Sequence, residues 1–439
     1  MSTSRRIFIR NSSLLAAGTG IFSFLPQDTL ALLRKRISAN DRIGVGVIGL
    51  NGMGWSNISA MLKANPETHC VAICDVDQNV LDKRAQELEK NFSMKPAQYG
   101  DYQKLLSDKN VDVVIIGTPD HWHCLQAVEA CQAGKDVYVE KPIANSIAEV
   151  RTMVAAQEKY NRVVQVGQWQ RSHAHFQSAL DVIRSGDLGK IRMVKTWAYM
   201  GWMKNIPIKA DSTAPAGVNY DMWLGPARKR PFNPNRFHFN FRWFWDYAGG
   251  LMTDWGVHLV DYALLGMNAK DPKTIMASGG KMAYPDDAAE TPDTLATVYD
   301  FGDFIMLWEH AQAIDAGNYG RTHGIAYIGN NGTLVLDRGG WEIIPEGKNM
   351  EAVKVKKSDD GLANNTRNFI EVVKSRDFSK LNAPLQAGAT VATICQMGNI
   401  AYKTGKKLIW DKQKQLFTDS EANKLITPVY HNKYTLPKM

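Results

Sequence analysis

A group of three glycines between two short apolar runs constrains this chain more strongly than any other feature. In chain order the segment contains an apolar run over residues 43–50 that includes Gly49, then Gly52 and Gly54, a helical stretch over residues 55–63, an apolar run over residues 70–74, and Asp75. Short apolar runs bounded by turn residues predict buried strands. This order of elements is typical of a βαβ unit that binds a nucleotide.

The glycine turn has the chemistry of a phosphate site. Gly49 permits a tight turn at the end of the strand, and Gly54 lets the helix pack close to that strand. The start of the helix then offers free N–H groups and the positive end of its dipole to a pyrophosphate. Asn51 occupies the middle position of the G-x-G-x-x-G pattern. The predicted contacts are Gly49, Asn51, Gly52, Met53 and Gly54.

Asp75 indicates which nucleotide is bound. A carboxylate after the second strand accepts hydrogen bonds from the adenosine ribose hydroxyls and would repel a 2′-phosphate. Asp75 lies slightly farther from the glycines than the usual spacing of about 20 residues. The sequence therefore predicts NAD, in preference to NADP, as the cofactor.

The pattern of elements changes once along the chain. Up to residue 167, apolar strands alternate with helices, which predicts an α/β fold with a doubly wound parallel sheet. Beyond it, strands separated by Gly-Asp and Asn-Gly turns predict an antiparallel sheet in a second, α+β domain. The predicted divisions are a signal segment over residues 1–31, a Rossmann domain over 41–167, a substrate domain over 168–411 and a peripheral tail over 412–439.

The first 31 residues predict export from the cytoplasm. Residues 4–10 (SRRIFIR) resemble a twin-arginine signal, and an apolar stretch and a small-residue cleavage site at residues 29–31 follow. The apolar stretch is too short and too rich in Gly and Ser for a stable membrane span, although uncleaved it would tether the protein to the inner membrane. We expect a periplasmic protein that folds around NAD, passes through the twin-arginine machinery and keeps the nucleotide tightly bound.

The charge distribution and the cysteine spacing argue against a nucleic-acid-binding protein and against a disulfide-linked fold. The formal net charge is +8, but the basic residues are scattered, which argues against a nucleic-acid partner. Cys70 and Cys74 lie on one predicted strand, and Cys124 and Cys131 on one predicted helix. Neither pair can approach within the roughly 7 Å that a disulfide requires. We expect the cysteines to be free and buried.

Four motifs in order resemble the Gfo/Idh/MocA oxidoreductases, the family of glucose–fructose oxidoreductase and inositol dehydrogenase. They are GLNGMG at residues 49–54, Thr118-Pro119 with His123, Glu140-Lys141-Pro142, and GGLMTDWGVHLVD at residues 249–261. The likeness extends over about residues 42–411. It implies a Rossmann domain followed by an open antiparallel sheet, in agreement with the pattern of elements.

The second and third motifs follow strands whose carboxyl ends border the ligand crevice. Judged by its position alone, Lys141 could equally be a solvated residue of a turn or an active-site residue. The resemblance implies that Lys141 is catalytic and that the Lys141–Pro142 bond is cis, and a lysine here would stabilise negative charge on a substrate oxygen. His121 and His123 lack a nearby carboxylate to complete a metal site, so no metal is predicted. The cofactor contacts predicted in this region are Thr118, Pro119, His121, His123, Glu140, Lys141 and Gln168.

Asp254 and His258 lie four residues apart, so they share one face if the segment is a single helix. Without the resemblance, structural roles explain both residues: Asp254 as a helix cap and His258 as a buried core histidine. The resemblance implies catalytic roles: His258 as the base that removes a hydroxyl proton, and Asp254 as the group that binds the hydroxyl or orients His258. Asp261 is a second possible partner of His258.

A long aromatic and proline-rich insertion lies between Gly201 and Gly250. Half of the 12 tryptophans lie in or beside it, between residues 197 and 255. Flat aromatic faces stack on sugar rings, but the same residues also suit core packing or an interface between subunits. The predicted substrate contacts are Lys141, Trp169, Arg171, Arg242, Trp243, Trp245, Asp254 and His258.

These features predict an NAD-dependent dehydrogenase that oxidises a secondary hydroxyl of a sugar or glycoside. Two alternatives stay open: a redox-assisted glycosidase, in which NAD is regenerated in each turnover, and a periplasmic sugar-binding module that retains inert NAD. The open sheet that the family implies also favours a homo-oligomer.

Overall fold

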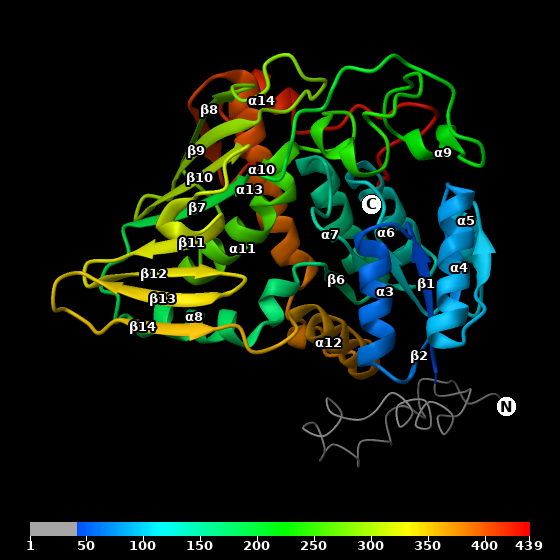
Figure 1. Cartoon of the computed structure of the whole chain (residues 1–439), viewed down its shortest axis with the longest axis horizontal. Helices are drawn as coiled ribbons and strands as arrows, with labels where there is room; N and C mark the ends of the chain where they lie inside the picture. Colours follow the sequence, from blue (N-terminus) through cyan, green and yellow to red (C-terminus); the bar gives the residue numbers. More distant parts are fainter. Residues whose placement is uncertain (1–41) are drawn as a thin grey trace, which may run out of the picture.

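The computed structural model describes residues 42–439, which fold into two sheets flanked by helices (Figure 1). The predicted export signal and its cleavage site lie outside the described residues. Among those residues no helix is long and apolar enough to cross a bilayer. The five cysteines are free and buried, as their spacing predicted.

The first sheet is parallel throughout, in the order β3-β2-β1-β4-β5-β6. Its strands are β1 (Ile43–Ile48), β2 (Thr68–Cys74), β3 (Ala97–Tyr99), β4 (Val113–Ile116), β5 (Asp136–Val139) and β6 (Val164–Val166). The order reverses between β1 and β4, which places the ligand crevice at their carboxyl ends. The predicted Rossmann arrangement is confirmed.

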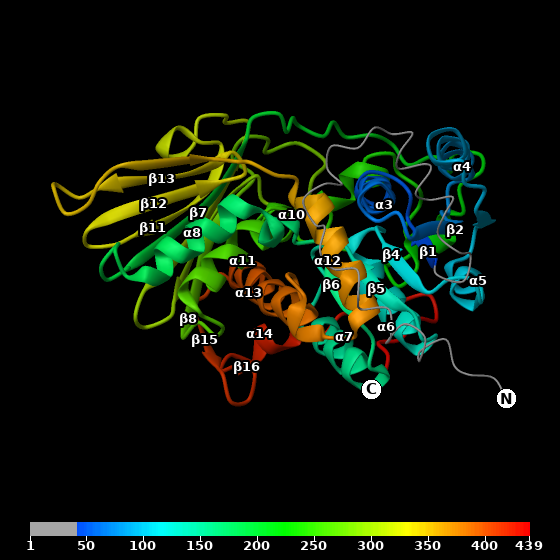
Figure 2. The ribbon, with the colours of Figure 1, turned by 90° about the horizontal axis from the view of Figure 1, so that it is seen from below.

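Helices cover both faces of this sheet because its strands are apolar on both sides. The helices that follow its strands are α3 (Met53–Ala64), α4 (Gln78–Phe92), α5 (Tyr102–Ser107), α6 (Asp120–Gln132) and α7 (Ile147–Tyr160). A helix from much later in the chain, α12 (Gly361–Ser375), packs beside α3 and adds Phe369 and Ile370 to the core on that face of the sheet. Figure 2 shows α12 running past the first sheet.

The second sheet has the order β14-β13-β12-β11-β7-β10-β9-β8-β15-β16. Its strands are β7 (Met193–Met200), β8 (Thr274–Gly280), β9 (Thr294–Asp300), β10 (Ile305–Gln312), β11 (His323–Ile328), β12 (Gly332–Asp337), β13 (Gly340–Pro345), β14 (Val353–Lys356), β15 (Leu408–Asp411) and β16 (Leu416–Phe417). The prediction of a purely antiparallel sheet is wrong at one place, since β7 and β10 pair in parallel. The insertion and two strands separate them in sequence, and this long connection lets β10 return in the same direction.

Helices pack on this sheet between it and the first domain (Figures 1 and 2). They are α8 (Ala174–Ser185), α10 (Gly250–Asp254), α11 (Gly256–Met267) and α13 (Leu385–Thr404). The helix α13 also contacts α7 of the first domain, where Gln386 Nε2 donates to Gln157 Oε1 at 3.2 Å.

The C-terminal residues are not the peripheral tail that their composition suggested. They include β16 and α14 (Ser420–Lys424), and beyond these Tyr430 donates a hydrogen bond to Glu149 at 2.6 Å. The Tyr434 ring packs edge-on against Trp122, with centres 5.4 Å apart. These aromatic contacts fasten the end of the chain to the helices of the first domain.

The insertion crosses from the second sheet to the edge of the first. It contains the short helix α9 (Tyr220–Leu224) and the 3₁₀ helix η5 (His238–Trp243). Gln78 N donates to Gly217 O at 2.9 Å, and His238 Nε2 lies 3.0 Å from Asp77 Oδ2. The insertion therefore forms the outer wall of the crevice beside β1 and β2.

Candidate active site

A cavity of about 540 Å³ lies at the carboxyl ends of the first sheet, under the insertion. Its walls include these predicted cofactor residues: Gly49, Asn51, Gly52, Met53, Asp75, Thr118, Pro119, His123, Glu140 and Lys141. Arg242 and Asp254 border the cavity beside Lys141. Residues that the sequence reasoning did not select also line it: Tyr102, Asp120, Trp122, Gln126, Met222, Trp223, His238, Phe239 and Phe241.

Three backbones meet at the glycine turn. Gly49 has φ 82°, and a Cβ added to Gly54 would lie 1.8 Å from Gly49 O. A Cβ on Gly117, at the end of β4, would lie 2.7 Å from Gly54 Cα. Gly54 therefore does not line the cavity; it allows α3 to start directly against β1 and β4.

The start of α3 fits a pyrophosphate. No side chain caps the helix. Gly54 N donates to Asn51 O at 3.1 Å, which leaves the N–H groups of Met53 and Trp55 in the first turn beside the cavity that Gly52 and Met53 line. A Cβ on Gly52 would meet no atom within 4 Å, which leaves open space where a phosphate would approach the backbone. The free backbone N–H donors and the open space beside them suit the pyrophosphate of a dinucleotide.

Asp75 stands at the adenosine end of the cavity. Its Oδ2 accepts a hydrogen bond from Leu50 N at 2.9 Å, and its Oδ1 accepts one from Asp77 N at 3.0 Å. Burial raises the pKa of Asp75, while these two backbone donors oppose that shift. The carboxylate is thus fixed in place with lone pairs left for ribose hydroxyls, as NAD binding requires.

Replacing Asp75 with Asn should weaken NAD binding by about tenfold to a hundredfold, because hydrogen bonds to a charged acceptor are lost. The same change removes the charge that repels a 2′-phosphate, so the preference for NAD over NADP should shrink. Titration of nucleotide-free protein with each nucleotide measures both effects. An unchanged ratio of the two affinities would contradict the assignment.

Lys141 and Asp254 meet at the other end of the cavity. Lys141 Nζ donates to Asp254 Oδ1 and to Asp254 O, both at 2.8 Å. Arg242 Nε donates to the same Oδ1 at 3.3 Å. The three residues come from the end of β5, from α10 and from η5, and the Lys141–Pro142 bond is cis. The fold thus collects two cations around one carboxylate, whose side chain is 14% exposed.

Asp254 stays ionised in this setting. Burial would raise its pKa, but the charges and hydrogen bonds of Lys141 and Arg242 hold it at about 2. No hydrogen bond joins Asp254 to His258 among the described residues, and the helix is interrupted between them at Trp255, where α10 ends and α11 has not yet begun. Asp254 is instead an acceptor beside the ammonium group of Lys141.

His258 is buried in α11, and its side chain makes no hydrogen bond with any described residue. Its ring lies 6.2 Å from the Trp169 ring and 6.3 Å from the Trp255 ring, measured between centres. Burial and the charge of Lys141 hold its pKa well below the usual value, so it is neutral near pH 7. The alternative partner, Asp261, is taken by Arg171 through two bonds of 2.7 Å.

The low pKa of His258 predicts a specific pH profile. A neutral imidazole accepts a proton, and protonation removes that ability only as the pH falls through its pKa. From pH 8 down to pH 6, kcat/KM should therefore lack the inflection near 6.5 of an ordinary histidine. A wild-type inflection between pH 6 and 7 that disappears in His258→Asn would contradict this.

Two further acids, Asp120 and Glu140, line the cavity. Burial raises the pKa of Asp120 to about 8, although the charges of Arg242 and Lys141 oppose the shift. Glu140 is also buried; it accepts hydrogen bonds from Asn57 Nδ2 at 2.8 Å and from Lys141 N at 3.2 Å. Asp120 was missed because its sequence context, a helix start after proline, is an ordinary capping context.

Several predicted residues lie away from the cavity. His121 Nε2 lies 3.1 Å from Trp223 O, and Gln168 donates to Val257 O at 3.3 Å. Trp243 is buried in the core, and Trp245 donates to Glu290 O at 3.0 Å. The structure gives these four residues packing contacts.

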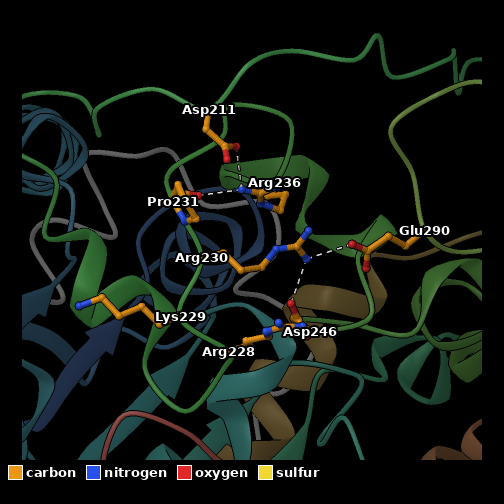
Figure 3. A pocket seen from close by; sticks show the side chains of 8 residues that line it. All are labelled: Asp211, Arg228, Lys229, Arg230, Pro231, Arg236, Asp246 and Glu290. Carbon is orange, nitrogen blue, oxygen red and sulfur yellow. Dashed lines mark hydrogen bonds and ion pairs between the residues drawn. The ribbon is translucent and has the colours of Figure 1, made fainter.

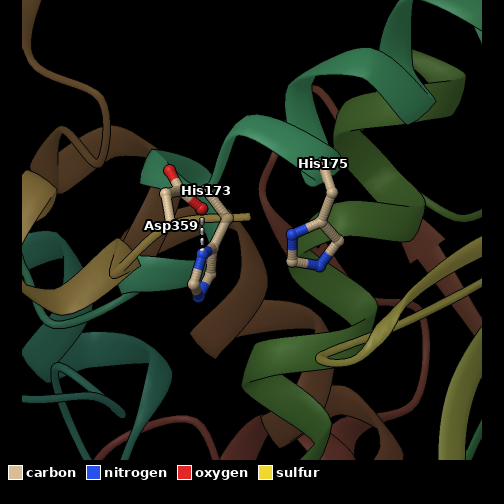
Figure 4. Close-up of side chains that lie close together, drawn as sticks. All are labelled: His173, His175 and Asp359. Atoms are coloured by element: carbon tan, nitrogen blue, oxygen red, sulfur yellow. Dashed lines mark hydrogen bonds and ion pairs between the residues drawn. The ribbon is translucent and has the colours of Figure 1, made fainter. Parts of the chain in front are cut away.

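Two clusters of polar side chains outside the cavity are held together by ion pairs and hydrogen bonds. A surface hollow of about 480 Å³ is formed around Arg230, which contacts Asp246 and Glu290 at 2.9 Å each (Figure 3). In Figure 4, His173 Nδ1 lies 2.8 Å from Asp359 Oδ1, beside His175. Asp359 also accepts hydrogen bonds from Ala174 N and Asn364 Nδ2, so it ties the start of α8 to α12.

Comparison with known proteins identifies the family of this chain. The sequence matches two profiles of one family, the oxidoreductase family NAD-binding Rossmann fold over residues 43–168 and the oxidoreductase family C-terminal alpha/beta domain over residues 181–436. The chain belongs to the Gfo/Idh/MocA oxidoreductase family. It therefore carries an NAD-binding Rossmann domain.

Similar proteins of known name share only part of their length with this member of the family. It is 31% identical to inositol 2-dehydrogenase of Salmonella typhimurium over 150 residues, 34% of this chain and 44% of that protein. It is also 31% identical to a glycosyl hydrolase family 109 protein of Shewanella pealeana over 174 residues, 36% of this chain and 38% of that protein. The chain thus aligns with less than half the length of these relatives.

Solved structures share the fold over nearly their whole length. Levoglucosan dehydrogenase in complex with NADH and levoglucosan has a TM-score of 0.63 at 16% identity, covering 84% of this chain and 99% of that one. The WlbA dehydrogenase of Bordetella pertussis, in complex with NADH and UDP-GlcNAcA, has a TM-score of 0.60 at 19% identity, covering 84% and 99%. At these identities the likeness establishes the fold.

Proposed function

We propose that this oxidoreductase uses NAD to oxidise a secondary hydroxyl of a sugar or glycoside. The observation that carries the proposal is the Lys141–Asp254–Arg242 group at one end of the NAD cavity, with neutral His258 beyond it. An alcohol dehydrogenase needs a base for the hydroxyl proton and a cation for the developing negative oxygen. The residues at this end supply both.

In the proposed mechanism, each residue has one task. Lys141 donates a hydrogen bond to the substrate oxygen and stabilises its negative charge as the proton leaves. Asp254, held by Lys141 and Arg242, accepts a hydrogen bond from a neighbouring hydroxyl. His258 takes the hydroxyl proton on its neutral ring. NAD, when bound, supplies the acceptor for the hydride.

Two observations favour a sugar over a simple alcohol. Trp169 and Trp255 flank His258 and are only half-buried, so their faces can stack on a pyranose ring. Relatives in sequence and fold carry the names inositol 2-dehydrogenase and levoglucosan dehydrogenase. Both names refer to polyhydroxylated rings, the class proposed here.

Export and cofactor retention form part of the proposal. The twin-arginine pattern at residues 4–10 would bring the folded protein to the periplasm, where no free NAD is expected, so the nucleotide would stay bound between turnovers. A second sugar or keto-sugar would then reoxidise it in place. Pairing of two copies through the second sheet is likewise proposed.

A redox-assisted glycosidase is the second candidate, favoured by the likeness to glycosyl hydrolase family 109 proteins. The two functions leave different products. We expect glycosides incubated with the protein and a keto-sugar acceptor to yield an oxidised glycoside lacking two hydrogen atoms, detected by mass spectrometry. Release of free sugar and aglycone without an oxidised product would instead establish hydrolysis.

A further inference from the structure

Arg338 lies in an aromatic setting close to the proposed reaction centre. It occupies the turn between β12 and β13, and its Cζ lies 4.6 Å from the centre of the Trp169 ring and 4.5 Å from that of the Trp255 ring. Asp337 Oδ1 fixes this turn by accepting hydrogen bonds from Gly339 N at 2.7 Å and Gly340 N at 3.1 Å. The guanidinium group is therefore held over two indole faces by a rigid hairpin.

The Arg338 guanidinium has no anionic partner and no hydrogen-bond acceptor among the described residues, and its Nε is buried without a partner. The neighbouring Arg321, in contrast, pairs with both Asp337 and Glu342. Burial lowers the pKa of Arg338 to about 10, against the charge of Asp254. A half-buried arginine without an acceptor is costly unless a ligand supplies one.

The position of Arg338 connects it to the substrate side of the site. Trp255 directly follows Asp254 in sequence, and the same two indoles that contact Arg338 flank the ring of His258. A sugar held with its reacting hydroxyl at Lys141 and His258 would rest against this aromatic wall. Its ring substituents would then come within reach of the guanidinium group.

We infer that Arg338 binds a carboxylate on the sugar, so that the substrate is a uronic acid or uronate glycoside; this inference rests on the proposed function. The two indole rings contact the guanidinium group, and its N–H groups have no acceptor among the described residues. A planar carboxylate matches a guanidinium group through two parallel hydrogen bonds.

The test uses pairs of methyl glycosides that differ only at C6, a carboxylate in one and CH₂OH in the other, in the gluco and galacto series. Reduction of NAD is followed for each. In the wild-type protein one uronide should have a kcat/KM at least about tenfold above that of its neutral partner, because a charged hydrogen-bonded pair is gained. In Arg338→Met the KM for the uronide should rise until this difference disappears, with little change for the neutral glycoside.

Two further variants separate recognition from packing. Arg338→Lys keeps the charge but loses the flat fork, so it should restore only part of the preference. Lys403→Met is the matched control: Lys403 Nζ also lies over an indole, 3.9 Å from the centre of the Trp245 ring, but outside the site. It should leave the preference unchanged.

Binding of the uronide, measured by tryptophan fluorescence without turnover, keeps this inference separate from the proposed reaction. If neither sugar reduces NAD, the proposed function is wrong, and uronide binding that Arg338→Met abolishes would still support the carboxylate site. Three results would overturn the inferred carboxylate site: equal kcat/KM for the uronide and its neutral partner, an equal loss of kcat/KM for both in Arg338→Met, or equal binding of both sugars.

Discussion

Replacing Lys141 with Met is expected to lower the rate of hydride transfer by at least about a hundredfold to a thousandfold, the usual cost of removing one donor to a developing oxyanion. Lys141 Nζ makes two 2.8 Å hydrogen bonds to Asp254, and in the proposed mechanism it donates to the reacting oxygen. The variant should still hold NAD, because the glycine turn and Asp75 lie at the other end of the cavity.

Single-turnover kinetics with saturating sugar measures this effect separately from binding. Lys135→Met is a suitable control because Lys135 is also a buried lysine of the first domain, donating to Asp108 O at 2.9 Å and Val111 O at 2.7 Å. It should reduce stability but keep the rate of hydride transfer. A fast Lys141→Met variant would remove the proposed mechanism.

Replacing Gly54 with Ala is expected to cost at least about 3 kcal/mol of stability and most of the bound NAD, an effect at the upper end for overpacking. The new Cβ would lie 1.8 Å from the backbone oxygen of Gly49, and relief of this clash would shift α3 away from β1 and β4. That shift would displace the helix start that fits the pyrophosphate.

Gly100→Ala provides the control within the same domain, because a Cβ there meets no atom within 4 Å and its φ needs no glycine. Thermal unfolding and the nucleotide content of the purified proteins measure the two effects. We expect Gly100→Ala to resemble the wild type in both. If Gly54→Ala also retained normal nucleotide content, the assigned role of the turn would be incorrect.

Much of the first domain could be predicted from sequence because its signals are local. The apolar run before Gly49, the glycines themselves and the acid after β2 each require a particular backbone or burial, and they lie within 34 residues, from Arg42 to Asp75. The strand β3 was missed because Ala97–Tyr99 is short and exposed, and it carries no apolar pattern. These local sequence signals therefore identified the nucleotide cavity but not every strand of the first sheet.

The parts that escaped prediction depend on contacts between distant segments. The strand β10 pairs in parallel with β7, and α12 joins the core of the first domain, although no periodic pattern in either segment specifies its neighbour. Arg338 has no motif around it and gains significance only from Trp169 and Trp255, which lie 169 and 83 positions earlier in the chain. The helix break at Trp255, between Asp254 and His258, is likewise invisible in residue spacing.

The most direct test of the central claim uses the protein as purified, with no nucleotide added. It is mixed with monosaccharides, uronic acids and their methyl glycosides, and the near-ultraviolet absorbance of reduced nicotinamide is recorded. We predict a rise equal to the bound NAD with one class of sugar, reversed by a keto-sugar. Protein that holds oxidised NAD but shows no rise with any sugar of the panel would contradict the proposed dehydrogenation.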